Sequence, residues 1–367
     1  MARATEATQY APDVASPPGE TLIDVLDDRH MTQAELAERT GRPLKTINEI
    51  VKGKAAITPQ TAIQLERVLG IPAHFWLNRE ARYREHVARI QTDQELDDQA
   101  DWLDELPVRE MQRFGWIDQV RTRRARVAAC LSFFGVASVV AWRAVCAQQR
   151  AKFRRSSAFT HHEGAVAAWL RKGELEAAAI PCAPLDRERF RSALYDVRAL
   201  TMVNEPAVFV PRLQAICAAS GVAVVLVPTP CGTGASGAVR WLRPDRALIQ
   251  LSMRYLTDDH LWFTFFHEAG HVLLHGKRPV YLDGDGSEGD EEDQANRFAA
   301  DLLVPPAATA RLANIPKTAD AVKAFAREIG VAPGIVVGRM QHDGLVPYRT
   351  KLNALKVRYA WTMAASG

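Results

Sequence analysis

Residues 265–276 read FFHEAGHVLLHG, and this stretch decides what kind of domain the C-terminal part of the chain forms. His267 and His271 are four residues apart, so a helix places them one turn apart on the same face. Two imidazoles in this arrangement can hold one zinc ion. Glu268 is offset beside them, where it can reach a water on the metal without binding the metal itself.

The alternative is a core helix that contains two hydrogen-bonded histidines. The surrounding run LWFTFFHEAGHVLL is otherwise largely apolar, and burying His267, Glu268 and His271 there without a common ligand would cost free energy. We therefore predict a zinc site in which Glu268 is the general base, the HExxH arrangement of metallopeptidases.

A zinc site of this kind needs a third protein ligand. His275 lies one turn beyond His271, but ligands taken from one straight helix cannot close well around a single ion. Lys277 stands where the pattern HExxHxxGxxH requires a histidine. The segment EEDQANRFAADLLVP, further along the chain, offers Glu291, Glu292 and Asp293 by residue type. The residue types alone leave the choice among these three open.

Composition limits the class of protein. A chain of 367 residues predicts two or three domains, and a net charge of +3 gives no whole-chain argument for nucleic-acid binding. The five cysteines form no CxxC pair, which fits a reducing cytosol.

The N-terminus lacks the apolar segment of a signal peptide. The uncharged run Val127–Trp142 is short for a membrane span, and we expect a buried helix there. The predicted location is cytoplasmic, without membrane contact.

The pattern along the chain predicts a multidomain protein with an all-α head, an α-helical middle and an α+β C-terminal domain. Residues 1–18 are rich in Ala, Pro and Ser, so we expect a disordered tail. Residues 19–82 read as short helices separated by turns. Residues 83–185 read as a helical linker region, and residues 186–367 as the mixed domain.

Secondary structure in the mixed domain follows from periodicity. The β-branched run 221–228 predicts a buried strand, and 238–242 with 247–253 predicts a hairpin around an Arg-Pro-Asp-Arg turn. Helices are expected over 258–276 and 290–303.

The helical middle contains a basic region at residues 109–155, with eleven Lys or Arg against two acids. The simpler interpretation is solvated helix faces. The alternative is a second surface for nucleic acid or an acidic partner.

The N-terminal segments MTQAELAERTG and RPLKTINEIVKGK predict two short helices joined by a glycine turn at Gly41. Thr32 can cap the first of them, with Glu35 completing a capping box. Two such helices within a bundle of about five fit a helix-turn-helix, whose second helix lies in the major groove of DNA. Residues 39–54 hold five basic residues, Arg39, Arg42, Lys45, Lys52 and Lys54, against Glu49 alone, which favours phosphate contact. Arg42 and Lys52 are therefore included among the predicted DNA-binding residues. A plain helical bundle is the alternative.

Two resemblances extend these predictions. PGETLIDVLDDRHMTQAELAERTG, INEIVKGKAAITPQTAIQLERVLG and FWLNREARYREH closely resemble the HigA-like antitoxin branch of the XRE helix-turn-helix family. The resemblance implies binding to double-stranded operator DNA. It places Gln33 at the phosphate-contacting start of the first motif helix, and Lys45, Thr46 and Asn48 on the base-reading helix. A homodimer is expected, because helix-turn-helix proteins usually read two half-sites.

The second resemblance is carried by HEAGHVLLHGK and EEDQANRFAADLLVP, which resemble the ImmA/IrrE family of HExxH zinc metallopeptidases. It implies a small α+β, zincin-like domain with a three-stranded sheet, whose edge strand near 237–242 could accept an extended substrate. It also implies that Glu292, three residues before Ala295, is the third zinc ligand and that Asn296 supports the site. Gln294 departs from many relatives, which carry a further glutamate at that position.

Candidates for stabilising an oxyanion are Tyr255, Tyr281 and His275. The glycine-rich stretch 232–237 is interpreted as a flexible loop near the cleft.

The favoured hypothesis is a DNA-binding regulator whose zinc-dependent endopeptidase domain cleaves a protein partner of the repressor or antitoxin class. The alternative is a non-enzymatic HigA-like antitoxin or repressor with a zinc-bearing sensor or toxin-binding domain. Glu268 favours catalysis, because a purely structural zinc site does not need it.

Overall fold

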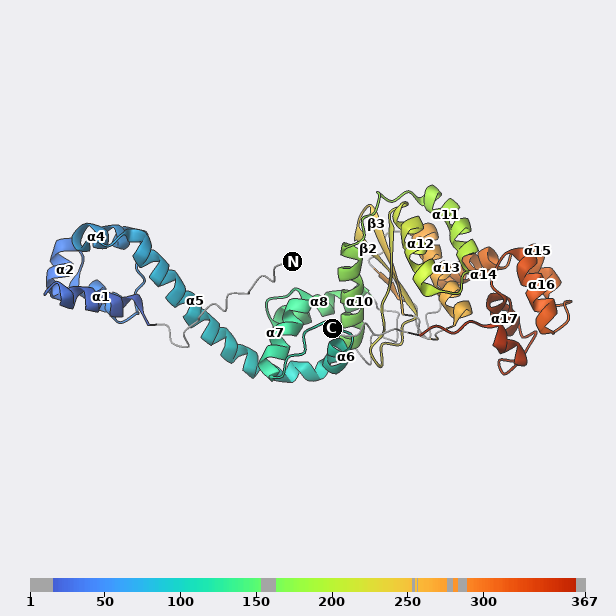
Figure 1. Ribbon diagram of the computed structural model, residues 1–367, viewed down its shortest axis with the longest axis horizontal. Helices are drawn as coiled ribbons and strands as arrows, with labels where there is room; N and C mark the ends of the chain where they lie inside the picture. The colour runs from blue at the N-terminus through green and yellow to red at the C-terminus, as the bar shows by residue number, and fades with distance from the viewer. Residues whose placement is uncertain are drawn as a thin grey trace, which may run out of the picture. The chain divides into compact units, whose positions relative to one another are not determined.

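The computed structural model describes residues 16–152, 163–252, 255, 257–275, 280–282 and 289–360, with side chains left out at 149–152 and 280–282. The chain divides into two compact units, residues 1–98 and 99–367 (Figure 1). The first unit is all-α and the second is α+β, which confirms the predicted fold class. The predicted disordered tail lies almost wholly outside the described residues, and Pro18 already begins the first helix.

Five helices form the first unit. They are α1 (Pro18–Asp28), α2 (Gln33–Thr40), α3 (Leu44–Val51), α4 (Pro59–Leu69) and α5 (Ala73–Asp98). Each helix places apolar residues at helical spacing on one face, and Leu22, Leu36, Ile47, Leu65 and Trp76 meet in a core with no solvent exposure.

Local signals set the ends of these helices as the sequence predicts. The hydroxyl of Thr32 accepts a hydrogen bond from the backbone N–H of Glu35 at 3.2 Å, and Thr58 caps α4 in the same way. Gly41 ends α2 at a φ of 66°, a left-handed conformation that glycine adopts without steric cost. The turn that follows leads directly into α3.

The second unit begins with short helices. They are η1 (Ala100–Glu105), α6 (Val108–Arg113), α7 (Arg123–Phe134), α8 (Val139–Lys152) and α10 (Glu163–Ala178). The single buried helix predicted over Val127–Trp142 is wrong, because Gly135 ends α7 at a φ of 68° and a new helix begins at Val139. By length and composition alone Arg123–Gln148 could span a membrane, a test that core helices of soluble proteins also pass. Trp102, Phe134 and Trp142 pack together across the break.

A four-stranded sheet lies at the centre of the second unit, in the order β1-β3-β2-β4. Its strands are β1 (Val222–Leu226), β2 (Gly237–Arg243), β3 (Arg246–Leu251) and β4 (Val280–Leu282). β1 is parallel to β3, whereas β2 is antiparallel to both of its neighbours. The predicted hairpin is confirmed, but the expected three-stranded sheet with β2 at its edge is wrong. β4 pairs with Ala238–Arg240 and removes that part of β2 from the edge.

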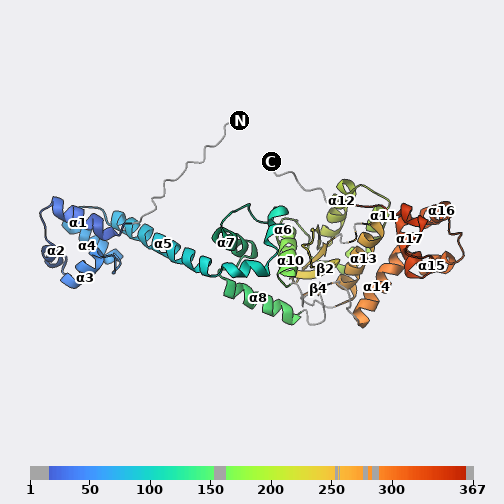
Figure 2. The same ribbon diagram turned by 90° about the horizontal axis from the view of Figure 1, so that it is seen from below.

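Helices cover both faces of this sheet, which explains why β1 is wholly apolar and why β3 is apolar apart from Arg246 and Gln250. Alternate side chains of β1 point to opposite faces: Val222 and Val224 join the core beneath α12 (Pro206–Ala218) and α13 (Asp258–Leu274). Ala223 and Val225 pack under α10 on the other face. Figures 1 and 2 show the helix α10 beside the sheet. α10 lies within the predicted linker region and packs on the sheet. The two compact units divide between residues 98 and 99, and the boundary at residue 185 stays a prediction.

The remaining helices complete the second unit. They are α11 (Arg187–Leu200), α14 (Asp290–Leu303), α15 (Pro306–Leu312), α16 (Ala319–Ile329) and α17 (Pro333–His342), followed by the short helix η2 (Lys351–Leu355). The guanidinium of Arg198 joins three of them, because it donates to the carbonyls of Leu302, Leu303, Ile329 and Gly330 at the ends of α14 and α16. The last carbonyls of a helix have no partner within their own helix, so one half-buried cation satisfies two helix ends.

Candidate metal centre and nucleic-acid interface

Three potential metal donors meet where α13 packs on α14. Nε2 of His267 lies 3.0 Å from Nε2 of His271, because the two residues are one turn apart on α13. Oε2 of Glu292, in the first turn of α14, lies 3.1 Å from Nε2 of His267 and 3.5 Å from Nε2 of His271. Gly270 permits this close helix contact, since a Cβ there would lie 3.2 Å from the Cα of Ala295.

The spacing of these donors fits a small tetrahedral ion. Zinc bonds to nitrogen and oxygen at about 2.0–2.2 Å, so two donors on a tetrahedron are roughly 3.3 Å apart. The three observed separations, 3.0, 3.1 and 3.5 Å, surround this value. Both imidazoles are almost fully buried, and only the carboxylate of Glu292 is partly exposed. The donor set therefore has the composition, spacing and burial of a two-histidine, one-carboxylate zinc site.

Hydrogen bonds on the far sides of the rings orient both histidines. Nδ1 of His267 lies 2.9 Å from Oδ1 of Asn296, and Nδ1 of His271 lies 2.8 Å from Nδ1 of His275. With a proton on each Nδ1, the lone pair of each Nε2 is directed toward Glu292. His275 is itself buried, and its carbonyl accepts a hydrogen bond from Arg187. His275 therefore contacts the side of the His271 ring that faces away from the proposed metal position. From there it does not support the predicted role of stabilising an oxyanion.

Glu268 is completely buried beside the donors, and β2 approaches its carboxylate closely. A Cβ built on Gly237 would lie 2.3 Å from Oε1 of Glu268 and 2.7 Å from a methyl carbon of Thr264. Only glycine leaves room for the carboxylate at this position. The sequence interpretation treated Gly237 as the end of a loop, and a glycine at the start of a strand was the signal of close backbone approach.

Electrostatics in the cluster favour an ionised Glu292 beside a neutral His271. Burial alone would raise the pKa of Glu292, but hydrogen bonds with His267 and His271 outweigh this effect and lower the pKa to about 2. Burial lowers the pKa of His271, although its hydrogen bond with Glu292 acts in the opposite direction. An ionised carboxylate and neutral imidazoles are the forms that bind a metal cation.

The other candidates named from the sequence are placed elsewhere or lie outside the description. Glu291 and Asp293 are not members of the donor cluster, whereas Glu292 is. The ring of Tyr255 stacks on His260, with centroids 4.4 Å apart, toward the opposite end of α13. Tyr281 belongs to β4, but its side chain lies outside the described residues.

The first unit presents the predicted helix-turn-helix. Ile47 and Ile50 fix α3 against the core, so Lys45 lies on its outer face with 85% of its side chain exposed. Thr46 and Asn48 are half-buried, and Lys52 is exposed directly after α3.

Two further predicted DNA contacts have different environments. Nε of Arg42 donates to Oε1 of Gln64 at 2.6 Å, so this guanidinium is tied to α4. Gln33 begins α2, as predicted. Their roles in DNA binding remain predictions, as do those of the α3 residues.

The basic region of the helical middle is partly neutralised by acids that precede it in sequence. Arg123 forms ion pairs with Asp101 and Asp104, and Arg143 pairs with Glu105 at 2.6 Å. The acids lie on or beside η1, a short helix that the charge count over 109–155 did not include. This pairing favours the simpler interpretation, solvated helix faces.

These observations define a helix-turn-helix unit joined in one chain to an α+β unit with a metallopeptidase-like donor cluster. Family models match both parts. Residues 22–76 match a helix-turn-helix family, and residues 219–340 match the M78 peptidase family, described as an IrrE N-terminal-like domain. The chain thus combines an XRE-like helix-turn-helix domain with an ImmA/IrrE-like domain, as the two resemblances predicted.

Similar proteins each match less than a quarter of the chain. The chain is 34% identical over 61 residues to the uncharacterized HTH-type transcriptional regulator YddM of Escherichia coli K12, a match that covers 17% of this chain and 65% of that relative. A putative antidote protein of a plasmid maintenance system from Nostoc punctiforme has 32% identity and a TM-score of 0.22, covering 23% of this chain and 91% of its own. A HigA-family addiction module antidote protein from Coxiella burnetii has 26% identity and a TM-score of 0.21, with coverages of 23% and 92%.

Proposed function

We propose that this chain is a cytoplasmic, DNA-binding transcriptional regulator whose second unit is a zinc-dependent endopeptidase acting on a protein partner. The observation that carries the proposal is the cluster of His267, His271 and Glu292 with the buried carboxylate of Glu268 beside it. A site that only held a metal for structural reasons would have no use for this fourth group.

In the proposed reaction each residue of the cluster has one task. Zinc, held by His267, His271 and Glu292, would supply a Lewis acid that polarises the carbonyl of the scissile peptide bond. Glu268 accepts a proton from the attacking water and then delivers it to the leaving amine. Glu268 has no solvent exposure, so bulk water is kept away from this carboxylate. Asn296 and His275 hold the two imidazoles in position.

The exposed face of α3 supports operator binding by the first unit. Lys45 and Asn48 project from a helix whose opposite side is buried, as a major-groove helix requires. Lys45→Ala should weaken binding to the promoter of the protein's own gene and lower its salt dependence. A mobility-shift titration with equal affinity for operator and random duplex would exclude sequence-specific recognition. We expect a homodimer, and light scattering with and without DNA tests this expectation.

Glu268→Gln tests the peptidase. This substitution should leave zinc and DNA binding intact, because Glu268 is not one of the metal donors, and it should abolish cleavage of the partner. The experiment is co-expression of either version with the product of the neighbouring gene, read by intact mass and promoter activity.

Cleavage by the wild type alone supports the peptidase. If both versions leave the partner intact, co-purify with it and regulate the promoter equally, the chain is instead a zinc-bearing antitoxin or repressor.

A further inference from the structure

A second potential site lies next to the metal donors. An open cavity of 870 Å³ is lined by α13, α14, α17 and the C-terminal segment that contains η2. Sites for small organic molecules commonly measure about 300–1,000 Å³ and are lined mostly by apolar groups with a few polar ones. The lining of this cavity has the same character, with Phe263, Val304 and Ile335 contributed by three different segments.

The cavity reaches the back of the metal site. Asn296 lines it, and the same side chain binds Nδ1 of His267, on the side of the ring opposite Nε2. Phe263 lies one turn before His267 on α13 and also lines the cavity. None of the three metal donors does so. An occupant would therefore touch the residue that orients a metal donor without touching the donors.

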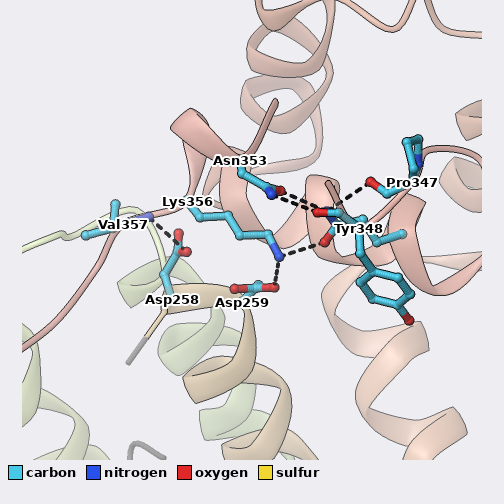
Figure 3. Close-up of polar contacts among 8 residues, drawn as sticks. Asp258, Asp259, Pro347, Tyr348, Asn353, Lys356 and Val357 are labelled. Carbon is cyan, nitrogen blue, oxygen red and sulfur yellow. Dashed lines mark hydrogen bonds and ion pairs between the residues drawn. The ribbon is translucent and has the colours of Figure 1, made fainter. Parts of the chain in front are cut away.

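A partly buried polar network holds the far wall in place (Figure 3). Nζ of Lys356 lies 2.6 Å from Oδ2 of Asp259 and 2.8 Å from Oε1 of Gln341. Nε2 of Gln341 in turn donates to Oδ1 of Asn353 at 2.8 Å and to the carbonyl of Tyr348 at 3.2 Å. This network ties the C-terminal segment to both α13 and α17. The cavity is therefore preformed, and no segment has to be reordered to create it.

The charges around the cavity favour an anionic occupant. Four cations line it, namely Arg297, Arg339, Lys356 and Arg358, against two acids, Asp259 and Asp301. Asp259 pairs with Lys356, and Asp343, outside the cavity, pairs with Arg339 at 2.8 Å. In the part of the chain that the structure describes, Arg297 and Arg358 have no carboxylate partner, and Asp301 is the one lining acid without a cation. The result is an excess of positive charge beside an apolar lining.

We propose that this cavity binds a small organic carboxylate with an apolar body, and that its occupancy is coupled to the metal site through Asn296. Arg358 and Arg297 recognise the carboxylate, since a guanidinium pairs with this group through two parallel hydrogen bonds. Phe263 and the aliphatic side chains contact the apolar body. The coupling rests on the proposed zinc site, whereas binding of the carboxylate does not.

Calorimetric titration of the full-length protein tests the binding. The probes are benzoate, 4-phenylbutyrate and the dipeptide Ala-Phe, each compared with its neutral amide. The acids should bind at least about tenfold more tightly than the amides, because a charge-assisted hydrogen bond is lost with the carboxylate. Comparing phenylbutyrate with Ala-Phe distinguishes a free acid from a peptide C-terminus as the source of the group.

Variants locate the binding. Arg358→Gln should weaken binding of the acids by a similar factor, whereas Arg349→Gln should not. Arg349 is a matched control, because it is an exposed arginine of the same segment that does not line the cavity. Arg297→Gln is a second test, with circular dichroism reporting the fold of each variant. No saturable binding of any acid, equal binding of acids and amides, or unchanged binding in both cavity variants would overturn the proposal.

The coupling has a separate readout. Saturating 4-phenylbutyrate should change the zinc affinity of the wild type, and Asn296→Ala should remove this change while the carboxylate still binds. An unchanged zinc affinity would refute the coupling. A protein that binds the carboxylate but no zinc would refute the proposed function and leave the carboxylate site standing.

Discussion

Asp258, at the start of α13, makes the stability of the second unit depend on pH. Its side chain is 1% exposed, and Oδ1 accepts a hydrogen bond from the backbone N–H of Val357 (Figure 3). The Cβ position of Gly334 lies only 2.4 Å from both of its oxygens, so α17 leaves no space for water there. Burial, assisted by the charge of Asp259, raises the pKa of Asp258 from 3.8 to about 6.

The raised pKa means that the folded protein binds a proton here more tightly than the unfolded chain does. The stabilisation from this proton is complete below pH 3.8, falls as pH rises, and is absent above about pH 6. A difference of about two pKa units corresponds to about 3 kcal/mol. Asp258→Asn retains the acceptor for Val357 and cannot ionise. The variant should therefore gain up to about 3 kcal/mol relative to the wild type between pH 4 and pH 7.

Guanidinium unfolding at pH values from 4 to 8, followed by circular dichroism, measures this difference. Asp320→Asn is the matched control, since Asp320 lies in the first turn of α16 but is exposed. The control should follow the wild type at every pH. If the free energy of unfolding of Asp258→Asn runs parallel to the wild type from pH 4 to pH 7, the carboxyl of Asp258 ionises normally and the reasoning is wrong.

Three further predictions concern other parts of the second unit. Glu292→Ala should lose zinc, measured by elemental analysis, whereas Glu291→Ala should keep about one ion per chain; full occupancy in Glu292→Ala would move the third ligand elsewhere. Gly237→Ala should retain zinc but lose cleavage of the partner, because the added methyl group displaces the general base; unchanged cleavage would count against this contact. Arg198→Ala should lower the free energy of unfolding by about 2–4 kcal/mol, since four carbonyls lose their donor. The exposed Arg191→Ala on the same helix is its control, and equal losses in both variants would contradict the prediction.

Patterns that depend on neighbouring residues were readable from the sequence. The spacing of His267 and His271 placed them on one face of α13, and the apolar run around them predicted burial. The cap at Thr32 and the turn at Gly41 set the helix-turn-helix boundaries. These features are local, because backbone geometry alone relates residues that are a few positions apart.

The third donor required more than spacing within one helix. Glu291, Glu292 and Asp293 are consecutive acids, and residue type does not distinguish them. The resemblance to ImmA/IrrE peptidases implied Glu292, and the packing of α14 on α13 brings this carboxylate to the two imidazoles. The rotation of one helix against another depends on contacts across the whole interface, so no short pattern contains it.

Contacts between distant segments were decided only by the tertiary structure. The single helix expected over Val127–Trp142 was wrong because Gly135 takes a left-handed conformation, and the expected edge at β2 was wrong because β4 pairs with it. The cavity beside Asn296 had no signal in the sequence, since its walls come from segments separated by up to about a hundred residues. The sequence by itself determined the two domain types and the chemistry of the HExxH helix, because both depend on residues that lie only a few positions apart in the chain. The tertiary structure decided the third donor's position, the covered sheet edge and the cavity, because these depend on which surfaces meet when the chain buries its apolar side chains.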